Sequence, residues 1–317
     1  MPTLHKTDRI VVTGGAGFLG AHVVAELKAR GYSNIHIVRS KDYDLTREAD
    51  AARLFEREKP DAVVHLAASV GGIGANRANP GKFFYENLVM GAFVLEHGRR
   101  AGVRKILSTA TVCAYPKEAP LPFKEEDLWN GYPEETNASY GLAKKMLLVQ
   151  AQAYRAQYGL NAVTLFPVNM YGPGDRFDPA VSHVIPALID KLRKALSEGH
   201  GSIEVWGSGK ATREFLYVED AARGVVDALE RYDSGEPVNL ATGVETSIRD
   251  LVSLLSDLMG FKGEVVWRPD LPDGQPRRLF DASKAFERFG FRARIGLREG
   301  LRRTIDWRLS SDKSGDS

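Results

Sequence analysis

Three glycines at intervals of three residues constrain this chain most. Gly14, Gly17 and Gly20 lie in the stretch VVTGGAGFLG, after a pattern typical of a buried strand and before one typical of a helix that ends at Gly31. Without side chains the backbone can turn tightly and approach a pyrophosphate, which the N-terminus of the helix binds through free N–H groups. The spacing therefore predicts a dinucleotide-binding loop, with a simple tight turn as the alternative.

Strand and helix patterns continue to alternate beyond this loop. Strand patterns occur at NIHIVRS, PDAVVHLAA, KILSTAT and NAVTLFPVN. Helical patterns separate them, and the longest run from about Pro80 to Gly102 and from about Tyr140 to Tyr158. This order predicts an α/β fold with a Rossmann-type, doubly wound parallel sheet.

The pattern changes after Val168. We expect a loop at MYGPGDRFDPAVSH, a short helix at VIPALIDKLRKAL, and a strand, a loop and a helix within IEVWGSGKATREFLYVEDAARGVVDALE. VNLATG is typical of a further strand of the main sheet. We therefore expect a nucleotide-binding domain of residues 1–168 plus about 215–243, and a smaller α/β substrate-binding domain of about 169–214 plus 244–317.

The composition excludes several classes of protein. The 317 residues carry a formal charge of +2, with 43% hydrophobic and 26% charged residues, which is ordinary for a soluble enzyme and gives no reason to expect nucleic acid. The single cysteine excludes an intrachain disulfide. No apolar run approaches the roughly 20 residues of a membrane span, and MPTLHKTDR lacks the apolar core of a secretory signal. We expect a cytoplasmic protein without a metal site.

The end of the second predicted strand indicates which dinucleotide binds. Enzymes that use NAD usually place an acid there for the ribose 2′-hydroxyl. Here Arg39, Ser40 and Lys41 supply two cations and a hydroxyl, which suit the 2′-phosphate of NADP. The alternative is that both cations face solvent, and Asp42 and Asp44 nearby keep that interpretation open.

Tyr140 and Lys144 in SYGLAKK form the candidate reactive pair. Four residues on a helix span about 6 Å along its axis and return to the same face. A tyrosine has a pKa near 10, and we expect the neighbouring ammonium to lower it. The pair could then exchange a proton with a carbinol oxygen while hydride moves. The alternative is a core tyrosine and a surface lysine.

With these motifs the sequence resembles the extended short-chain dehydrogenase/reductase family over nearly its whole length. The resemblance implies that Thr111, with Ser108 and Thr109 as neighbours, supplies the hydroxyl that bonds the substrate oxygen. It also implies a set of cofactor contacts in the glycine loop, at the strand ends and in the reactive pair, namely Gly14, Ala16, Gly17, Phe18, Leu19, Gly20, Arg39, Ser40, Lys41, Ala67, Ala68, Tyr140, Lys144, Pro167, Asn169 and His183.

Several stretches are similar to one branch of that family, the GDP-L-fucose synthases. They are AASVGGIGANRANPGKFFYENL, CAYPK, NMYGPGDRFDPAVSHVIPALI, VWGSGKATREFLYVED and PDGQPRRLFD. The resemblance implies an NADPH-dependent enzyme that epimerises C3 and C5 of a GDP-4-keto-6-deoxymannose and then reduces C4. Cys113 matches the base and His183 the acid of the epimerisation. A buried thiol and a loop histidine are the alternatives.

The resemblance also implies contacts with the GDP-sugar. They are Asn169, Ser182, Lys191, Trp206, Arg213 and Arg278, and Arg277 is nearly as good a match as Arg278. The loop GGAGFLG departs from the GHRGMVG of many relatives, because Ala16 lies where an arginine would touch the cofactor phosphates. A related GDP-4-keto-sugar enzyme acting on a 6-deoxyheptose, a 4-epimerase that retains NAD, and a non-catalytic dinucleotide sensor are therefore the alternatives. The family is usually dimeric through the two long helices.

Overall fold

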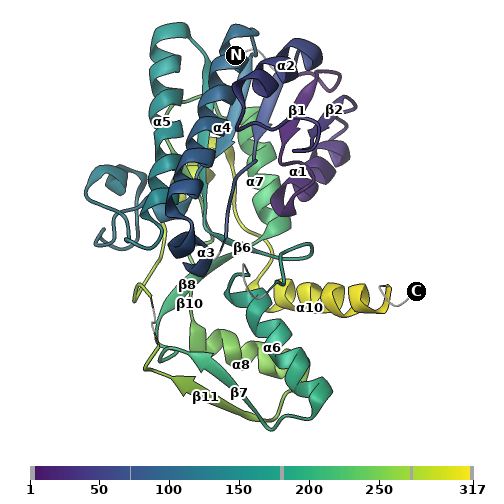
Figure 1. The fold of residues 1–317 in the computed structure, drawn as a ribbon, viewed down its shortest axis with the longest axis vertical. Coiled ribbons are helices and arrows are strands. Elements are labelled where there is room, and N and C mark those ends of the chain that lie inside the picture. Colours follow the sequence, from purple (N-terminus) through teal and green to yellow (C-terminus); the bar gives the residue numbers. More distant parts are fainter. Residues whose placement is uncertain (1–3, 72, 179–181, 272–273, 315–317) are drawn as a thin grey trace.

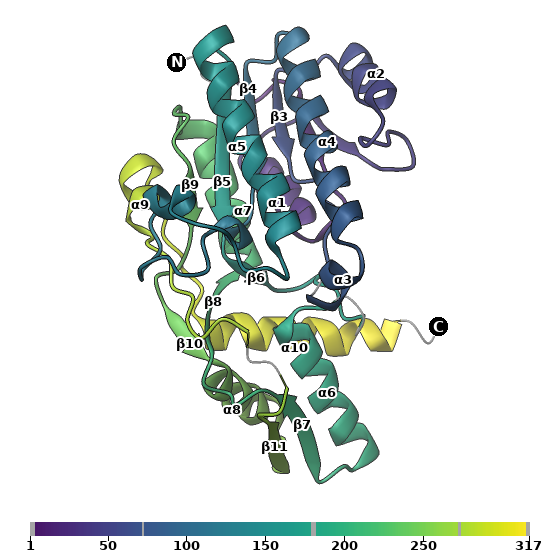
Figure 2. The same ribbon diagram turned by 60° about the vertical axis from the view of Figure 1, so that its left-hand side comes forward.

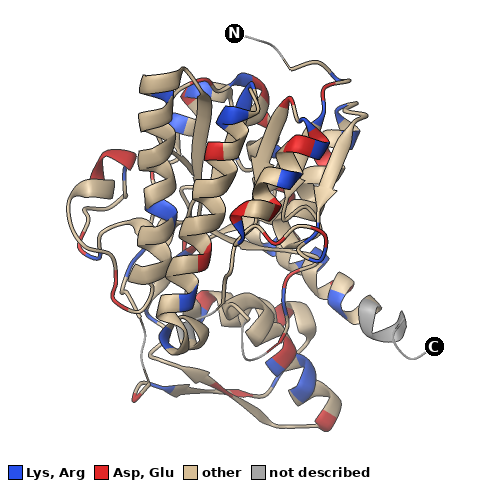
Figure 3. Cartoon of the chain, turned by 45° about the horizontal axis from the view of Figure 1, so that its top comes forward, with Lys and Arg blue, Asp and Glu red and all other residues tan. Residues whose placement is uncertain are grey.

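The computed structural model describes residues 4–71, 73–178, 182–271 and 274–314. Parts of three quoted motifs, at residues 72, 179–181 and 272–273, lie outside these ranges. Basic and acidic positions are interspersed along the helices and loops (Figure 3). None of the described helices combines the length and the apolar character needed to cross a bilayer.

A six-stranded parallel sheet forms the larger part of the molecule. Its order is β2-β1-β3-β4-β5-β9, so the chain leaves β1 in one direction and returns on its other side. The predicted doubly wound sheet is confirmed. A reversal of this kind places a ligand-binding crevice at the carboxyl ends of β1 and β3. The strands are β1 (Ile10–Thr13), β2 (Ile35–Val38), β3 (Ala62–His65), β4 (Lys105–Thr109), β5 (Asn161–Pro167) and β9 (Val238–Leu240).

Helices cover both faces of this sheet (Figures 1 and 2). Helices α1 (Phe18–Ala29) and α7 (Val218–Arg231) pack together on one face, over Val12 and Val64. Helices α2 (Glu48–Glu58), α4 (Pro80–Arg100) and α5 (Ala138–Tyr158) cover the other face, over Val11 and Val63. Both faces are buried, which explains why these strands read as continuous apolar runs. The short α3 (Ile73–Ala78) precedes α4.

The remaining elements lie at the carboxyl side of the main sheet. A three-stranded sheet has the order β10-β8-β6, and β11 pairs with β7 in a two-stranded parallel sheet. An apolar cluster that includes Ile189, Leu255 and Leu301 holds α6, α8 and α10 together. The elements are β6 (Asn169–Tyr171), α6 (Val184–Glu198), β7 (Ser202–Trp206), β8 (Thr212–Tyr217), β10 (Glu245–Ser247), α8 (Ile248–Met259), β11 (Glu264–Arg268) and α10 (Leu297–Ser314). Helix α9 (Ser283–Phe289) instead packs beside β9 and α7.

Two strands lie where the sequence predicted loop. Strand β6 begins the stretch expected to be a Gly/Pro-rich loop, and β8 occupies the expected loop before α7. β6 has only three residues, which is too short for an alternating pattern to appear. In β8 the last four residues are all buried, so it also lacks the alternation of a half-buried strand.

Candidate active site

The glycine loop packs closely against the end of β3. Gly14 has a φ of +70°, and the Gly17 N–H donates to the Gly14 carbonyl over 2.9 Å. A Cβ on Gly20 would lie 2.0 Å from the Gly14 oxygen, and one on Gly14 would lie 2.8 Å from the Ala67 nitrogen. Helix α1 follows with no acidic residue in its first turn. The loop therefore fits a pyrophosphate at the N-terminus of α1.

The predicted cofactor residues around this loop lie on three strand ends. Arg39, Ser40 and Lys41 follow β2 and are exposed, and within the described ranges neither cation forms an ion pair. The Arg39 carbonyl accepts the N–H groups of Asp42 and Tyr43, which fixes the turn. Both cations are thus available to a phosphate. Ala16 is exposed, Ala67 and Ala68 are half-buried after β3, and Pro167 is buried at the end of β5.

Thr111 joins the reactive pair to the cysteine. Its side chain hydrogen-bonds Tyr140 and accepts the Cys113 N–H over 3.2 Å at the start of the turn η1 (Val112–Ala114). Helix α5 approaches this turn closely, because a Cβ on Gly141 would lie 2.5 Å from the Cys113 carbonyl oxygen. The structure therefore brings Thr111, Cys113 and Tyr140 together. Ser108 lies on β4, before this turn.

Burial dominates the ionisation of the reactive pair. It raises the pKa of Tyr140 above its ordinary value, nearby Cys113 adds to the rise, and the Thr111 hydrogen bond opposes it. Burial also lowers the pKa of Lys144 to about 8. The expected lowering of the Tyr140 pKa by Lys144 is therefore wrong for this structure. A phenol that keeps its proton is suited to donate it.

His183 lies at the N-terminus of α6, on a segment that also contacts α1. The His22 ring bonds the Pro173 carbonyl over 2.9 Å, which anchors this segment to the helix after the glycine loop. His183 is an exposed residue. Desolvation by the surrounding protein, followed by the positive charge of Arg176, nevertheless lowers the pKa of its ring. Among the described residues His183 makes no hydrogen bond with Cys113 or Tyr140, so their convergence on one ligand stays a prediction.

The structure separates the two candidate arginines near the C-terminus. Arg278 donates from Nη2 to the Val112 carbonyl over 2.6 Å, so it lies beside the turn that carries Cys113. Arg277 forms an ion pair with Glu245 at 2.7 Å, with more than half of its own side chain exposed. Arg278 is therefore the arginine that adjoins the reactive group.

The other predicted substrate residues lie on β6 to β8. Arg213 donates to the carbonyl groups of Thr212 and Gln275, each over 2.6 Å. Lys191 donates to the Glu204 carbonyl over 2.6 Å, which places its ammonium on β7, the strand that ends at the 66% exposed Trp206. Two further predicted substrate residues lie apart from this strand. The Asn169 amide donates to the Glu214 carbonyl over 3.4 Å, and the Ser182 N–H donates to the Asp178 carbonyl.

Sequence reasoning missed Glu214, a fully buried carboxylate on β8. It accepts the Gly243 N–H over 2.8 Å and the Phe280 N–H over 3.0 Å, and it also accepts the Thr242 N–H. It thereby ties the segments that carry Arg213 and Arg278 to one another. Recognising β8 would have exposed the signal, a glutamate among apolar residues of a buried strand.

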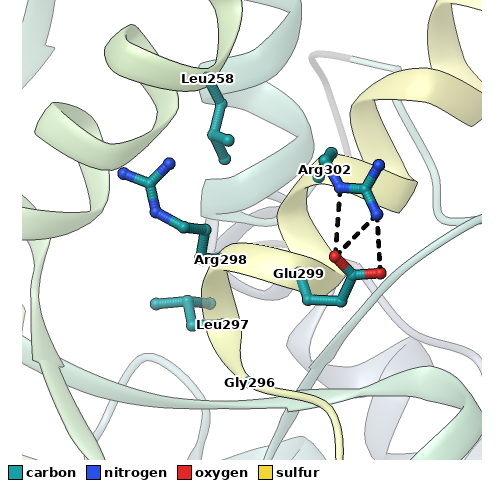
Figure 4. Close-up of a pocket in the computed structure, with 6 residues that line it drawn as sticks. All are labelled: Leu258, Gly296, Leu297, Arg298, Glu299 and Arg302. Carbon is teal, nitrogen blue, oxygen red and sulfur yellow. Dashed lines mark hydrogen bonds and ion pairs between the residues drawn. The ribbon is translucent and has the colours of Figure 1, made fainter.

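A hollow of about 460 Å³ lies apart from these residues, between α8 and the start of α10 (Figure 4). Its lining includes Arg298, which pairs with Asp257 at 2.7 Å, and Arg302, which pairs with Glu299 at 2.8 Å. Both cations are thus already paired with carboxylates. In the described ranges, no group of three or more His, Cys, Asp or Glu side chains is arranged to hold a metal ion.

Comparisons with known proteins agree with this geometry. The sequence model of the "NAD dependent epimerase/dehydratase family" matches residues 10–241. GDP-L-fucose synthase 1 of Arabidopsis thaliana is 40% identical over 306 residues, 96% of this chain and 94% of that protein. A GDP-6-OMe-4-keto-L-xylo-heptose reductase of C. jejuni superposes with a TM-score of 0.92 at 29% identity, covering 98% of this chain and 99% of that one.

A GDP-L-fucose synthetase of Naegleria fowleri, solved with NADP, superposes with a TM-score of 0.90 at 31% identity and covers 98% of this chain and 96% of that one. The resemblance to the GDP-L-fucose synthases is thus confirmed over nearly the full length. The chain belongs to the NAD-dependent epimerase/dehydratase family.

Proposed function

We propose that this protein is an NADPH-dependent epimerase/reductase that converts GDP-4-keto-6-deoxy-D-mannose to GDP-L-fucose. The observation that carries the proposal is the shared contact of Thr111 with Tyr140 and with the Cys113 turn. It supports the action of a thiol and a phenol on one sugar, as an enzyme that inverts carbons next to a ketone and then reduces the ketone requires. The names of the relatives support the same activity.

Epimerisation needs a base and an acid on opposite faces of the sugar. The 4-keto group acidifies the C–H bonds at C3 and C5. At C3 and at C5 in turn, the Cys113 thiolate removes the proton and protonated His183 delivers one to the opposite face. Proton exchange with solvent restores the thiolate and the imidazolium after each inversion. Its lowered pKa makes the protonated ring a stronger acid, although a smaller fraction of it carries the proton at neutral pH.

Reduction follows at C4. When bound, NADPH supplies a hydride to this carbon. Tyr140 donates its proton to the C4 oxygen, and burial keeps that proton on the phenol until the oxygen becomes basic. The Lys144 ammonium then stabilises the phenolate that is left. The glycine loop and the two free cations after β2 hold the phosphates of the dinucleotide.

The GDP portion lies against the smaller group of elements. Arg213 and Arg278 suit the diphosphate, and the exposed Trp206 suits the base. We assign residues 1–168 plus about 215–243 to the cofactor domain and the rest to the sugar-nucleotide domain, in a cytoplasmic protein.

Helices α4 and α5 lie side by side on the outside (Figure 2) and expose Tyr85 and Val149. We assign this surface to a homodimer interface, which light scattering will test.

One assay tests the activity. Purified protein is mixed with NADPH and GDP-4-keto-6-deoxy-D-mannose, and nicotinamide absorbance is followed while NMR identifies the sugar. Consumption of NADPH with formation of GDP-L-fucose is the expected result. In D₂O, Cys113→Ser should stop deuterium entry at C3 and C5 and leave NADPH binding intact. Undiminished exchange in that variant would remove Cys113 from the role of base.

A second candidate is reduction of a GDP-4-keto-heptose, which the match to the C. jejuni heptose reductase favours. The same assay with that substrate separates the two, through the ratio of kcat/KM values. A 4-epimerase that retains NAD would carry the nucleotide through purification and consume no NADPH. The intact Thr111, Tyr140 and Lys144 set makes a non-catalytic sensor the weakest alternative, because a sensor needs no proton donor.

A further inference from the structure

Four polar side chains lie in one row across the centre of the main sheet. Thr13 is paired with His65, His65 with Ser108, and Ser108 with Thr164 on adjacent parallel strands. All four are at most 3% exposed. Residues two positions earlier on these strands belong to the apolar core under α4 and α5, so the row lies on the same face. This face also receives Lys144 from α5.

His65 is fixed in this row by one of its ring nitrogens. Nδ1 lies 2.8 Å from the Thr13 hydroxyl oxygen, which also accepts the Ala67 N–H over 3.3 Å. Since Thr13 is on the β1 side of His65, the opposite ring nitrogen Nε2 is directed toward β4 and β5. Nε2 is buried and has no hydrogen-bond partner among the described residues.

Lys144 is the cation whose charge acts on the His65 ring. Burial, with the Lys144 charge second, lowers the pKa of His65 to about 3, so the imidazole is neutral near neutral pH. Lys144 is itself 2% exposed. The other titratable groups near it are Tyr140 on its own helix and Cys113, which faces Tyr140 from η1. Ser108 and Thr164 from β4 and β5 do not titrate. A buried ammonium in such surroundings is stabilised by any acceptor or dipole directed at it.

We propose that His65 is a positioning residue that stabilises the Lys144 ammonium, through a tautomer that carries its proton on Nδ1 and directs the bare Nε2 toward Lys144. The Nδ1–H then donates to Thr13. The negative end of the imidazole dipole faces the cation, which keeps Lys144 protonated beside Tyr140. Its effect on catalysis rests on the proposed reduction, whereas its effect on Lys144 does not.

Two substitutions separate this role from simple fastening of β1 to β3. The amide of His65→Asn reaches the Nδ1 position and keeps the Thr13 bond, but nothing replaces Nε2. The amide of His65→Gln reaches the Nε2 position and removes the bond between Thr13 and the side chain at position 65, while the Ala67 N–H still donates to Thr13. His97→Asn is the matched control, because His97 on α4 is also a buried histidine, outside the site, whose Nε2 lies 3.5 Å from a Glu48 carboxylate oxygen.

The first measurement is ¹⁵N NMR of the unaltered protein, which should show His65 protonated on Nδ1. The second is the titration of the Lys144 side chain in each variant. In His65→Asn the midpoint should fall by about one pH unit, equivalent to a tenfold change in the protonation equilibrium. In His65→Gln and His97→Asn it should stay near that of the unaltered protein. The rate of NADPH consumption above neutral pH should follow the same order.

A proton on Nε2 would overturn the proposal, as would an unshifted Lys144 in His65→Asn. An equal shift of the Lys144 titration midpoint in both His65 variants would show that His65 only links β1 to β3. Neither NMR measurement uses a sugar. If the Lys144 midpoints change as expected but the protein does not consume NADPH, the result counts against the proposed function only. If both His65 variants fail to fold, the tautomer in the unaltered protein decides.

Discussion

The two parts of the site are held in different ways. At the carboxyl edge of the main sheet, Thr13, His65 and Ser108 lie in register, so backbone hydrogen bonds fix where each side chain begins. On the other side, Arg278 reaches a carbonyl 166 residues away in the sequence, and Glu214 binds backbone N–H groups of two separate segments. We therefore expect the geometry of the first part to change when atoms are added beside the backbone. We expect the geometry of the second part to change when a single polar side chain is removed.

The largest effect is expected at the sheet edge from removal of the phenol. Tyr140→Phe should lower kcat for reduction by about 10²- to 10⁴-fold, the range for loss of a general acid, with little change in NADPH affinity. Tyr154→Phe on the same helix is the control, since its hydroxyl bonds Glu96 at the surface. Stopped-flow absorbance measures both variants. Reduction by the Tyr140 variant at the parent rate would show that another group supplies the proton.

Gly141→Ala tests whether backbone spacing controls the sheet edge. The new methyl group would lie 2.5 Å from the Cys113 carbonyl oxygen, and neither backbone can yield without moving α5 from η1. We expect a loss of about 1–3 kcal/mol in the free energy of unfolding, as in other overpacked sites, with both proton exchange and reduction reduced. Gly81→Ala on α4 meets no atom within 4 Å and should change neither. Denaturant titration and D₂O exchange measure the outcome, and a Gly141 variant with normal exchange would contradict it.

Glu214→Ala tests the second part of the site. It leaves the N–H groups of Gly243 and Phe280 buried without acceptors, which should lower the free energy of unfolding by about 3 kcal/mol. Because the segments of Arg213 and Arg278 lose their common anchor, KM for the GDP-sugar should rise while NADPH affinity is kept. Glu198→Ala, an exposed residue of α6, should have no measurable effect. Thermal unfolding and isothermal titration provide the readouts, and an equal loss of NADPH affinity would show that the two parts are not separate.

The smallest effect is expected from substitution of the adjacent residues Arg277 and Arg278. Arg278→Met should raise KM for the GDP-sugar about tenfold, whereas Arg277→Met should change it less than about twofold, because exposed ion pairs contribute little. Steady-state kinetics at fixed NADPH compare the two. Equal effects would place both guanidinium groups on the ligand and remove the distinction that the Val112 contact draws.

The sequence predicted the regular part of the molecule well. The alternation of strands and helices and the i, i+4 spacing of Tyr140 and Lys144 express backbone periods, and the doubly wound sheet predicted from that alternation is confirmed. The short strands β6 and β8 were missed, since three residues, or four consecutive buried ones, show no alternation. Arg278 could not be separated from Arg277, because the distinction depends on a hydrogen bond to a distant carbonyl.

Two contributions lie beyond any local pattern. Glu214 acts through backbone groups of residues 242–280, which only the folded chain brings to it. The Tyr140 pKa was expected to fall, but burial, which depends on all surrounding segments, raises it. In both cases a property set by the neighbourhood in space outweighs one set by the neighbourhood in sequence.

The Thr111 hydroxyl serves the cysteine turn and the tyrosine at once. A substitution of Thr111 removes its contacts with both the Cys113 turn and Tyr140, so we do not expect it to yield an isomerase that releases its keto product. Removing only the Tyr140 oxygen leaves the bond from Thr111 to the Cys113 N–H in place. Removal of that one oxygen is therefore the change that we expect to leave an isomerase without reductase activity.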